Sequence, residues 1–413
     1  MDANRFVTQS LREPRITRIL AAAIDAVEPG KLVQKHLQHA DLPKYDRVLL
    51  LGIGKASEAM TRAAAEFFNK FTDALVITKY ASPSTRKRIT VMESGHPIPN
   101  ERSLAAGQAA LDFVSNLKES DLLVCLISGG GSALVTAPRK GITLADIQSQ
   151  TSNLLASGAA IHEINTLRRQ MDRIKGGGLV RSTKAKIVGL ILSDVIGNSL
   201  ETIASGLTVD PSLGTRVQNI IIGDIHVAAQ AAQQQAIMEG FDSDILDLQI
   251  KGEARKVGLH FAKRLKEESA ALRFSKGQKR KKPFCLIAGG ETTVTLRLRS
   301  PVPAALAQAG QALQRNGKGG RNQESALAAV DELSGIENIL LVSLATDGDD
   351  GPTDAAGAVV NGETRQRAEK LGMSAPDYLS RNDAYSFFDP LNDLIRCGYT
   401  GTNVNDLIFL MGL

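Results

Sequence analysis

Five short segments of the sequence combine glycines with a cationic or hydroxyl side chain. They are GIGKAS (52–57), SGGGS (128–132), KGGG (175–178), GGET (289–292) and GKGGRN (317–322). Glycine lets a backbone approach a phosphate closely, and amide N–H groups at the start of a helix point toward such an anion. Each segment alone is also typical of an ordinary turn. Together, with cations at Lys55, Lys175, Lys318 and Arg321, they predict a polyphosphate site.

Two of these loops carry most of the prediction. Lys55 stands where an apolar run gives way to a helical pattern, so it can reach a phosphoryl oxygen over the turn; the alternative is a tight turn with a solvated lysine. GIGKAS is neither a Walker A loop nor a dinucleotide fingerprint, which need a longer spacing or a third glycine. SGGGS offers the best backbone cradle, because three consecutive glycines are costly in entropy and packing alone does not explain them.

Carboxylates follow two apolar runs. TDGDDGPTD (346–354) comes directly after NILLVSLA, where the end of a strand in an α/β sheet binds ligands. Oxygen ligands suit Mg²⁺, and Asp347 is the first metal candidate, whereas Asp349 and Asp350 are expected in a polar turn. Asp194 follows IVGLIL. It is a candidate metal ligand or proton acceptor for a substrate hydroxyl, and a helix N-cap is the alternative.

The elements that must position these residues alternate between short apolar runs and longer helical patterns. This alternation predicts βα units and a parallel sheet. The expected strands of the first half are 47–53, 74–78, 89–92, 122–127, 187–192 and 219–222, with helices including 56–68 and 103–117. In the second half we expect a polar helix over 253–272, paired strands at 284–288 and 292–297, a buried strand over 338–345, and helices over 304–315 and 323–333.

Composition narrows the function classes. The chain has 413 residues, a net charge of +5 and 4% aromatic residues. The mild basicity suits an anionic substrate, and no aromatic-laced basic stripe supports nucleic-acid binding; the basic run 276–282 is expected to be a solvated linker. No apolar run is long enough to span a bilayer, and no signal-peptide pattern is present, so a cytoplasmic location is expected. Cys125 and Cys285, inside apolar runs, are expected to be buried, inert thiols, and His96 a hydrogen-bonded structural histidine.

Taken in order, the loops resemble the class II glycerate kinases, whose C-terminal part is called the MOFRL domain. The resemblance covers nearly the whole chain and is weakest before residue 45 and over 225–282. The matching segments are GIGKASEAM (52–60), SGHPIPNERSLAAG (94–107), ISGGGSALVTAP (127–138), EINTLRRQMDRIKGGGL (163–179), SDVIGNSLETIASGLTVDP (193–211), AGGETTVTL (288–296), GKGGRNQESALA (317–328), ATDGDDGPTDAAGAVV (345–360) and GTNVNDL (401–407).

The resemblance implies a two-lobed α/β fold, with a Rossmann-like N-terminal domain, a C-terminal MOFRL-like α/β domain and an active site in the cleft between them. We expect domains at 1–235 and 236–413, with a linker around 253–283. The implied reaction transfers the γ-phosphoryl group of ATP, with Mg²⁺, to the 2-hydroxyl of D-glycerate. The family's active-site lysine falls on Lys55 and its active-site arginine on Arg321.

The candidate site follows from both lines of reasoning. Lys55, Arg321 and Asp194 are the candidate catalytic residues, Asp347 and Asp194 the metal ligands, and Arg173 and Lys175 the binders of the substrate carboxylate. The candidate ATP- and phosphate-binding residues are Gly52, Gly54, Ser128, Gly129, Gly130, Gly131, Ser132, Gly289, Gly290, Glu291, Thr292, Gly319, Gly320 and Asn322.

This sequence departs from the family pattern at four places. The usual Gly-Asp after SDV is Gly197–Asn198, and the usual Ser-Gly-Pro ends in Leu207. Asp224 stands where the family has Ser, and Tyr399 where it has Pro. Three alternatives stay open: a kinase for a related hydroxy acid, a hydroxypyruvate reductase, as members of the family are often named, and a non-catalytic nucleotide or sugar-phosphate binding protein.

Overall fold

Two six-stranded sheets dominate the computed structural model, which describes residues 1–40, 45–81, 87–156, 161–274, 283–296 and 317–413. The expected helix over 304–315 and the basic run 276–282 lie outside the described residues. The chain divides into a parallel-sheet unit, Val27–Asp224 with Gly401–Val404, and a mixed-sheet unit, Met1–Ala26, Ile225–Thr400 and Asn405–Leu413. These units differ from the expected split at residue 235, because the first 26 residues pack with the second half of the chain.

The parallel-sheet unit contains strands in the order β3-β2-β1-β4-β5-β6, all parallel. This is the doubly wound order, in which strands leave β1 on one side and then resume at β4 on the other. The strands are β1 (Arg47–Ile53), β2 (Asp73–Thr78), β3 (Ile89–Glu93), β4 (Asp121–Ile127), β5 (Lys186–Leu192) and β6 (Val217–Gly223). Every strand expected in the first half is therefore confirmed to within a few residues.

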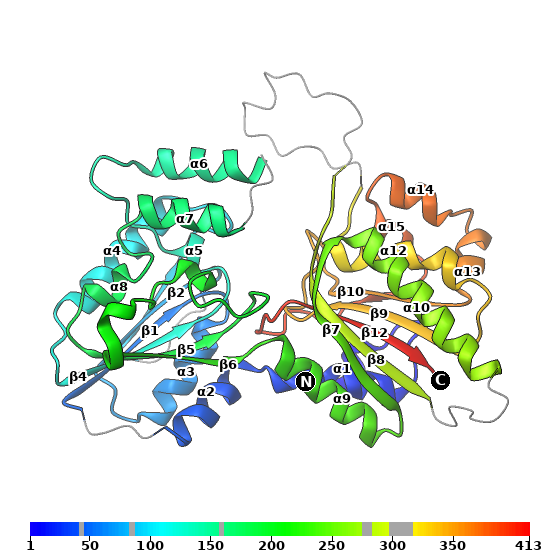
Figure 1. The fold of residues 1–413 in the computed structure, drawn as a ribbon, viewed down its shortest axis with the longest axis horizontal. Coiled ribbons are helices and arrows are strands. Elements are labelled where there is room, and N and C mark those ends of the chain that lie inside the picture. Colours follow the sequence, from blue (N-terminus) through cyan, green and yellow to red (C-terminus); the bar gives the residue numbers. More distant parts are fainter. Residues whose placement is uncertain (41–44, 82–86, 157–160, 275–282, 297–316) are drawn as a thin grey trace. The chain divides into compact units, whose positions relative to one another are not determined.

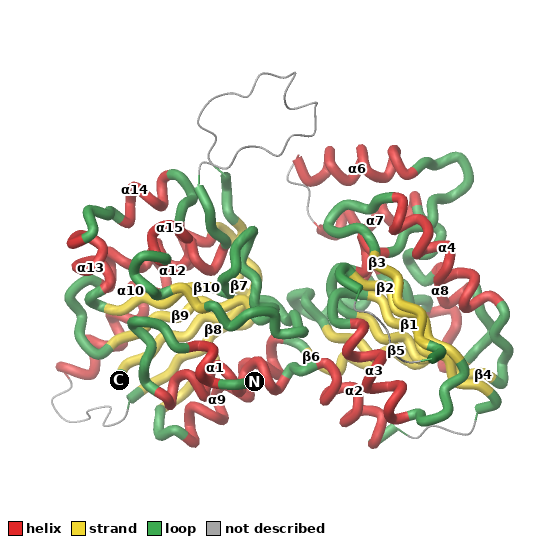
Figure 2. The backbone as a smooth tube through the Cα atoms, turned by 180° about the vertical axis from the view of Figure 1, so that it is seen from behind, coloured by secondary structure: helices red, strands yellow, loops and turns green. Residues whose placement is uncertain are grey.

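Helices cover both faces of this sheet (Figure 1), as a sheet with nearly continuous apolar strands requires. Alternate residues of β1 and β4 pack against one layer of helices, and α2 and α3 lie together on the other face (Figure 2). The helices are α2 (Pro29–Gln38), α3 (Ser57–Phe67), α4 (Glu101–Ser115), α5 (Gly131–Leu134), α6 (Leu144–Ala156), α7 (Ile161–Met171) and α8 (Gly178–Arg181), with 3-10 turns η2 (Ile203–Ser205) and η3 (Pro211–Arg216).

The mixed-sheet unit has the strand order β11-β10-β9-β12-β8-β7, with β7 and β8 parallel and the other pairs antiparallel. Its elements are η1 (Ala3–Phe6), α1 (Pro14–Ala26), α9 (Ile225–Met238), β7 (Asp242–Glu253), α10 (Ala254–Phe274), β8 (Phe284–Thr293), α12 (Arg321–Leu333), β9 (Ile339–Ala345), β10 (Gly357–Asn361), α13 (Thr364–Lys370), α14 (Ala375–Ser380), α15 (Ala384–Phe388), β11 (Leu394–Ile395) and β12 (Asp406–Gly412).

Some of the elements predicted for the mixed-sheet unit are confirmed and one prediction is wrong. The helices over 253–272 and 323–333 and the buried strand over 338–345 are confirmed as α10, α12 and β9. The expectation of two paired strands around GGET is wrong, because one continuous strand, β8, runs through both glycines. Helices α10 and α12 pack on one face of the sheet, and α1 packs against α9 (Figure 1).

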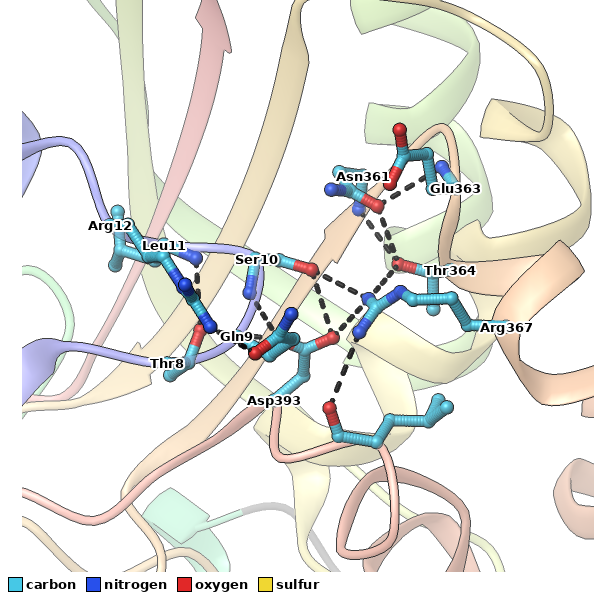
Figure 3. Close-up of polar contacts among 11 residues, drawn as sticks. Thr8, Gln9, Ser10, Leu11, Arg12, Asn361, Glu363, Thr364, Arg367 and Asp393 are labelled. Carbon is cyan, nitrogen blue, oxygen red and sulfur yellow. Dashed lines mark hydrogen bonds and ion pairs between the residues drawn. The ribbon is translucent and has the colours of Figure 1, made fainter. Parts of the chain in front are cut away.

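A buried carboxylate fastens the N-terminal segment to the mixed-sheet unit (Figure 3). Asp393 is fully buried and accepts hydrogen bonds from Ser10 N (2.7 Å), Ser10 Oγ (2.9 Å) and Thr8 Oγ1 (3.2 Å). It also forms an ion pair with Arg367 of α13, whose guanidinium donates to Ser10 Oγ as well (2.6 Å). The Asp393 carboxylate thereby joins two segments that lie about 385 residues apart in the sequence.

We predict that Arg367→Ala destabilises the mixed-sheet unit, whereas Arg365→Ala on the same helix does not. Removing one partner of a buried ion pair typically costs about 3–5 kcal/mol, since the other charge stays buried. Arg365 is 49% exposed and pairs with Glu369, and such a surface pair is worth about 0–1 kcal/mol. Thermal unfolding of the two variants should separate them by several degrees. Equal midpoints would show that the Asp393 contacts do not hold the unit together.

Candidate functional site

The loops after β1 and β4 meet at the point where the strand order of the parallel sheet reverses. Lys55 N–H donates to the carbonyl of Gly129 (2.9 Å), and Ala56 N–H donates to Ser128 Oγ (2.9 Å). Gly54, at φ 135°, lies so close to Ser128 that a Cβ there would come within 2.2 Å of its hydroxyl. In doubly wound sheets ligands bind at this switch point, so the two loops occupy the expected place for a site.

The amides of GIGKAS are used inside the protein. Gly54 N–H donates to the carbonyl of Ile77 (3.1 Å), and Lys55 and Ala56 N–H groups bond to the β4 loop. Gly52 is a packing glycine, because a Cβ there would clash with Thr61 of α3 at 2.3 Å. The prediction that Gly52 and Gly54 hold phosphate through their backbone is therefore not supported. What this loop offers a ligand is the half-buried Lys55 side chain.

SGGGS differs from the other glycine loops. Among the described residues, the N–H groups of Gly129, Gly130 and Gly131 donate to no acceptor, while Ser128 N–H bonds to the carbonyl of Ile53. Gly130 has φ 88°, a conformation that favours glycine. Three neighbouring amides without an acceptor in the described ranges are the arrangement that an anion cradle requires, and that role stays a prediction for this segment, which we call the cradle. Ser128 supports the cradle, and the Ser132 hydroxyl hydrogen-bonds that of Ser205 (2.7 Å).

Asp194, at the end of β5, faces the cradle. A Cβ on Gly129 would lie 1.9 Å from Asp194 Oδ2, so only glycine leaves room for this carboxylate. Asn403 Nδ2 lies 3.5 Å from the same oxygen and belongs to the segment Gly401–Val404 that completes the unit. We call Lys55, Gly129–Gly131, Asp194 and Asn403 the glycine-loop cluster. Asn403 was not identified as a site residue from the sequence, although it lies in the GTNVNDL segment.

The KGGG segment has a structural role. Gly176 N–H donates to the carbonyl of Ser205 (3.0 Å) and Gly177 N–H to that of Gly206 (2.7 Å), which supports a left-handed turn beside Ser132. Lys175 is 1% exposed and forms an ion pair with the equally buried Asp172 at 3.1 Å. Burial lowers the pKa of Lys175, and Asp172 opposes that shift.

These contacts correct the two predicted carboxylate binders. Asp172 accepts three further hydrogen bonds, from Thr136 Oγ1 (2.7 Å) and from the N–H groups of residues 137 and 174 (both 3.0 Å), so Lys175 belongs to a buried structural network. Arg173 is exposed and donates to Gln108 of α4. Neither residue is part of the proposed site.

Two departures from the family pattern contact each other. The Asn198 amide donates to the carboxylate of Asp224, at the end of β6. The Asp224 carboxylate therefore lies directly beside the position at which the family is expected to carry an aspartate. The other departures are unlike this pair, because Leu207 is buried in the core and Tyr399 is 57% exposed.

In the mixed-sheet unit, Arg321 begins α12 and is held by two carboxylates. Its guanidinium contacts both oxygens of Asp406, at the start of β12, and Nη1 donates to Glu291 Oε1 at 2.9 Å. Burial opposes the charge, but Asp406 and Glu291 hold the pKa of Arg321 above its ordinary value. Arg321 is therefore a fixed cation with 32% of its side chain exposed. Asp406 was not identified from the sequence.

The start of α12 already holds an anion of the protein. Asp350 is 2% exposed and accepts hydrogen bonds from the N–H groups of Asn322 (3.0 Å) and Gln323 (2.8 Å). A Cβ on Gly320 would collide with Asp350 at 2.3 Å. The Asn322 amide bonds to Asp350 and Ser343. Asp350 is thus a buried helix cap rather than a turn residue, and Gly320 and Asn322 serve that cap instead of a phosphate; Gly319 packs beside it, close to Gly351.

GGET forms part of strand β8. Gly289 and Gly290 pair with β12, and a Cβ on Gly290 would lie 2.2 Å from the carbonyl of Ile250 in β7. Their predicted role as a phosphate loop is not supported, because the sheet occupies their backbone. Thr292 is buried at 8% exposure. Glu291 is half exposed and pairs with Arg321, so it orients the cation instead of binding phosphate.

Asp347, the first metal candidate, follows β9 as expected and is half-buried. Its carboxylate accepts a hydrogen bond from Asp349 N–H (3.1 Å), which folds the acidic loop over the strand end. Within the described ranges no group of three or more His, Cys, Asp or Glu side chains is arranged to hold a metal by itself. Mg²⁺ typically takes one or two carboxylates and completes its shell with phosphates and water, so Asp347 suits a metal that arrives with a nucleotide.

A doubly wound sheet with an amide cradle and a lysine at its switch point defines a phosphate-binding α/β protein. The sequence profile of a family described as a domain of unknown function (DUF4147) matches residues 15–238, and that of the MOFRL family matches 284–406. In the described segments no helix is both long and apolar enough to cross a membrane.

Relatives extend this classification to the whole chain. A D-glycerate 2-kinase of Thermotoga maritima is 37% identical, over 98% of this chain and 99% of its own. A putative hydroxypyruvate reductase of Agrobacterium vitis is 34% identical, over 95% and 92%. The crystal structure of the Thermotoga maritima glycerate kinase superposes with a TM-score of 0.83, at 35% identity, over 96% of this chain and 98% of that one. The protein belongs to the glycerate 2-kinase family with a C-terminal MOFRL domain.

We predict that titration of Asp350 changes the stability of the mixed-sheet unit. Burial raises its pKa from 3.8 to about 7, although the Gln323 and Asn322 amides oppose the shift. The folded protein therefore binds this proton more tightly than the unfolded chain. The resulting stability is fully present below about pH 4 and is lost as the pH rises through about 7, with a slope of at most about 1.4 kcal/mol per pH unit.

Asp350→Asn should flatten that part of the stability profile, because the side chain no longer titrates. Thermal unfolding at intervals between pH 4 and 8 measures the slope in the variant and the wild type. Asp349→Asn, at the exposed neighbouring position, is the matched control and should follow the wild type. A profile unchanged in Asp350→Asn would contradict the assignment.

Proposed function

We propose that the protein transfers the γ-phosphoryl group of ATP to the 2-hydroxyl of D-glycerate, giving 2-phosphoglycerate and ADP. The observation that carries the proposal is the cradle of Gly129–Gly131, whose amides have no acceptor among the described residues and which adjoins Lys55. Kinship with a D-glycerate 2-kinase over nearly the full length supports the same reaction. A cytoplasmic location remains part of the proposal.

The reaction breaks the bond between the γ-phosphorus and the β,γ-bridging oxygen of ATP and forms a bond to the acceptor oxygen, which loses its proton. Catalysis of such a transfer depends mainly on positioning and on charge neutralisation. The amides of Gly129–Gly131 would bind phosphate oxygens, and the Lys55 ammonium would offset the charge of the transferred group. Backbone amides and a partly buried lysine suit this role, because they are in place before the reactants bind.

Arg321 is the second cation of the proposal. Asp406 fixes its guanidinium from β12, and the more exposed Glu291 pairs with Nη1. A phosphate oxygen would displace Glu291, whose carboxylate then returns to water, while Asp406 keeps the guanidinium oriented. We propose that Arg321 contributes to charge neutralisation in the transfer.

We further propose that Mg²⁺ accompanies ATP. Asp347 and Asp194 are the candidate residues that would hold it, since each is a half-buried carboxylate at the end of a strand. When bound, the metal would neutralise charge on the phosphate oxygens. Asp194 has the alternative role of accepting the proton of the substrate hydroxyl, and its place against Gly129 is compatible with either.

A nicotinamide-dependent reductase is the main rival, and a relative carries that name. The dinucleotide fold places a pyrophosphate on the amides at the start of the helix after β1. Here the amides of Lys55 and Ala56 at that helix start donate to the β4 loop. The rival requires NADH fluorescence to change on mixing. A pure nucleotide sensor requires ATP binding without turnover, and a kinase for a related hydroxy acid requires a different acceptor in the same assay.

We predict that Lys55→Ala and Arg321→Ala each lower kcat by about 10²–10³, the usual loss for a preorganised donor to developing charge. ATP, Mg²⁺ and D-glycerate are supplied to purified protein, and phosphorus NMR identifies the phosphoglycerate formed. Arg62→Ala and Arg365→Ala, which remove exposed cations, are the controls. Failure of the wild type to form 2-phosphoglycerate while it still binds ATP would overturn the D-glycerate assignment.

The cradle itself can be tested with a glycine pair. Gly130→Ala and Gly197→Ala both place an alanine at a positive φ, 88° and 82°, so their backbone strain is similar. Only at Gly130 does the new Cβ meet neighbours, His96 and the Lys55 stem at 3.1–3.3 Å, whereas Gly197 has open space. We expect calorimetry to show ATP binding weakened about tenfold or more in Gly130→Ala only, a loss of about 1.4 kcal/mol. Equal losses would indicate strain alone.

A further inference from the structure

His96 lies in the loop between β3 and α4, and that loop is firmly anchored. Ser94 N–H donates to the carbonyl of Thr78 (2.9 Å), and its hydroxyl donates to that of Leu134 (2.6 Å). Asn100 caps α4 through the N–H groups of Arg102 and Ser103. The backbone that carries His96 is thus fixed on both sides of the residue.

The imidazole lies at the glycine-loop cluster. A Cβ on Gly130 would come within 3.1 Å of His96 Cδ2 and 3.2 Å of Nε2, and within 3.3 Å of Lys55 Cγ. The Nε2 edge of the ring, the Lys55 stem and the cradle therefore meet at one point. Lys79, directly after β2, acts on the ring electrostatically and adds a second cation to this end of the sheet.

In the described part of the chain, no hydrogen-bond partner explains the position of the ring. It makes no hydrogen bond to any of the described residues, which corrects the expectation of a hydrogen-bonded structural histidine. By contrast, His36 and His39 each place Nδ1 within 2.9 Å of a backbone carbonyl. Burial, followed by the charges of Lys55 and Lys79, lowers the pKa of His96 from 6.5 to about 4, so the ring is neutral at physiological pH.

A neutral imidazole offers one donor and one acceptor. A hydroxyl group has the complementary pair, whereas ionised phosphate and carboxylate oxygens only accept and are better matched by the two lysines. We propose that His96 contacts the acceptor substrate and hydrogen-bonds the hydroxyl that receives the phosphoryl group. The inference rests on the proposed function for the identity of that substrate.

Kinetics separate this role from a structural one. His96→Ala should lower kcat/KM for D-glycerate about 10–100-fold, the range for losing one hydrogen bond together with the alignment it enforces. His96→Gln should recover part of that loss, because its amide again offers a donor and an acceptor. The Kd for ATP should stay within about twofold of wild type in both variants, and His39→Ala, at an exposed histidine, should match the wild type throughout.

A second readout does not depend on turnover. The six histidines give separate ring C–H signals in NMR, and His96→Gln identifies that of His96 by its disappearance. D-Glycerate should shift this signal saturably, and propionate, which lacks hydroxyl groups, should not. A wild type that gives this shift but no phosphoglycerate would overturn the proposed reaction and leave the contact standing. Unchanged kcat/KM in His96→Ala, or a signal that responds to ATP alone, would overturn the contact.

Discussion

The crossing of the β1 and β4 loops is the contact on which the rest of the parallel-sheet unit depends. Two hydrogen bonds, from Lys55 N–H to Gly129 and from Ala56 N–H to Ser128, join the loops where the sheet changes direction. They direct the amides of GIGKAS inward, while the amides of Gly129–Gly131 find no acceptor among the described residues. The crossing also sets Lys55 beside the cradle. A single local arrangement thus decides which glycines pack and which are available to an anion.

The glycine-rich starts of α5 and α12 differ in which group lies at the helix N-terminus. A helix N-terminus carries partial positive charge and favours a nearby anion. At α12 the protein supplies that anion itself, as the buried Asp350. At the loop before α5 no carboxylate in the described part of the chain accepts from the glycine amides, and Asp194 instead approaches the Cα of Gly129. A buried carboxyl group of the protein occupies the helix start in one unit, whereas the described residues place none on the glycine amides of the other loop, which are therefore accessible to a ligand.

The sequence was sufficient for elements that depend on local patterns. Every strand of the parallel sheet was found from apolar runs, which are nearly continuous in β1, β2, β4 and β5 because both faces of those strands are buried. Strand β7 was missed because buried residues such as Ser243 and Leu248 alternate with exposed charges, a weaker pattern in an edge strand. The continuous strand through GGET was missed because its glycines read as a turn.

The site was predicted less completely, for a physical reason. Lys55, Arg321 and Asp194 lie at a strand end or a helix start, as predicted. That position follows from the order of apolar and polar residues along the chain. Lys175 and Asn322 looked equally suited to binding anions. Lys175 instead pairs with the buried Asp172 in the preceding turn, and the Asn322 amide donates to Asp350, 28 residues later. Asp406, Asn403 and His96, whose ring has no hydrogen-bond partner among the described residues, carry no local signal, because their roles depend on contacts that only the fold creates.

Neither unit is built from one continuous stretch of chain. The N-terminal helix packs with elements after residue 225, and Ser10 bonds to an aspartate 383 positions later. At about 5–20 residues per second, a ribosome needs roughly 20–80 seconds to add the residues between them. During synthesis the first helix therefore emerges from the ribosome long before the elements that it packs against have been made. The parallel sheet can assemble meanwhile, but its last segment, Gly401–Val404, also arrives near the end. Neither half of the gene encodes a complete folding unit, so separation of the halves by recombination would leave both incomplete.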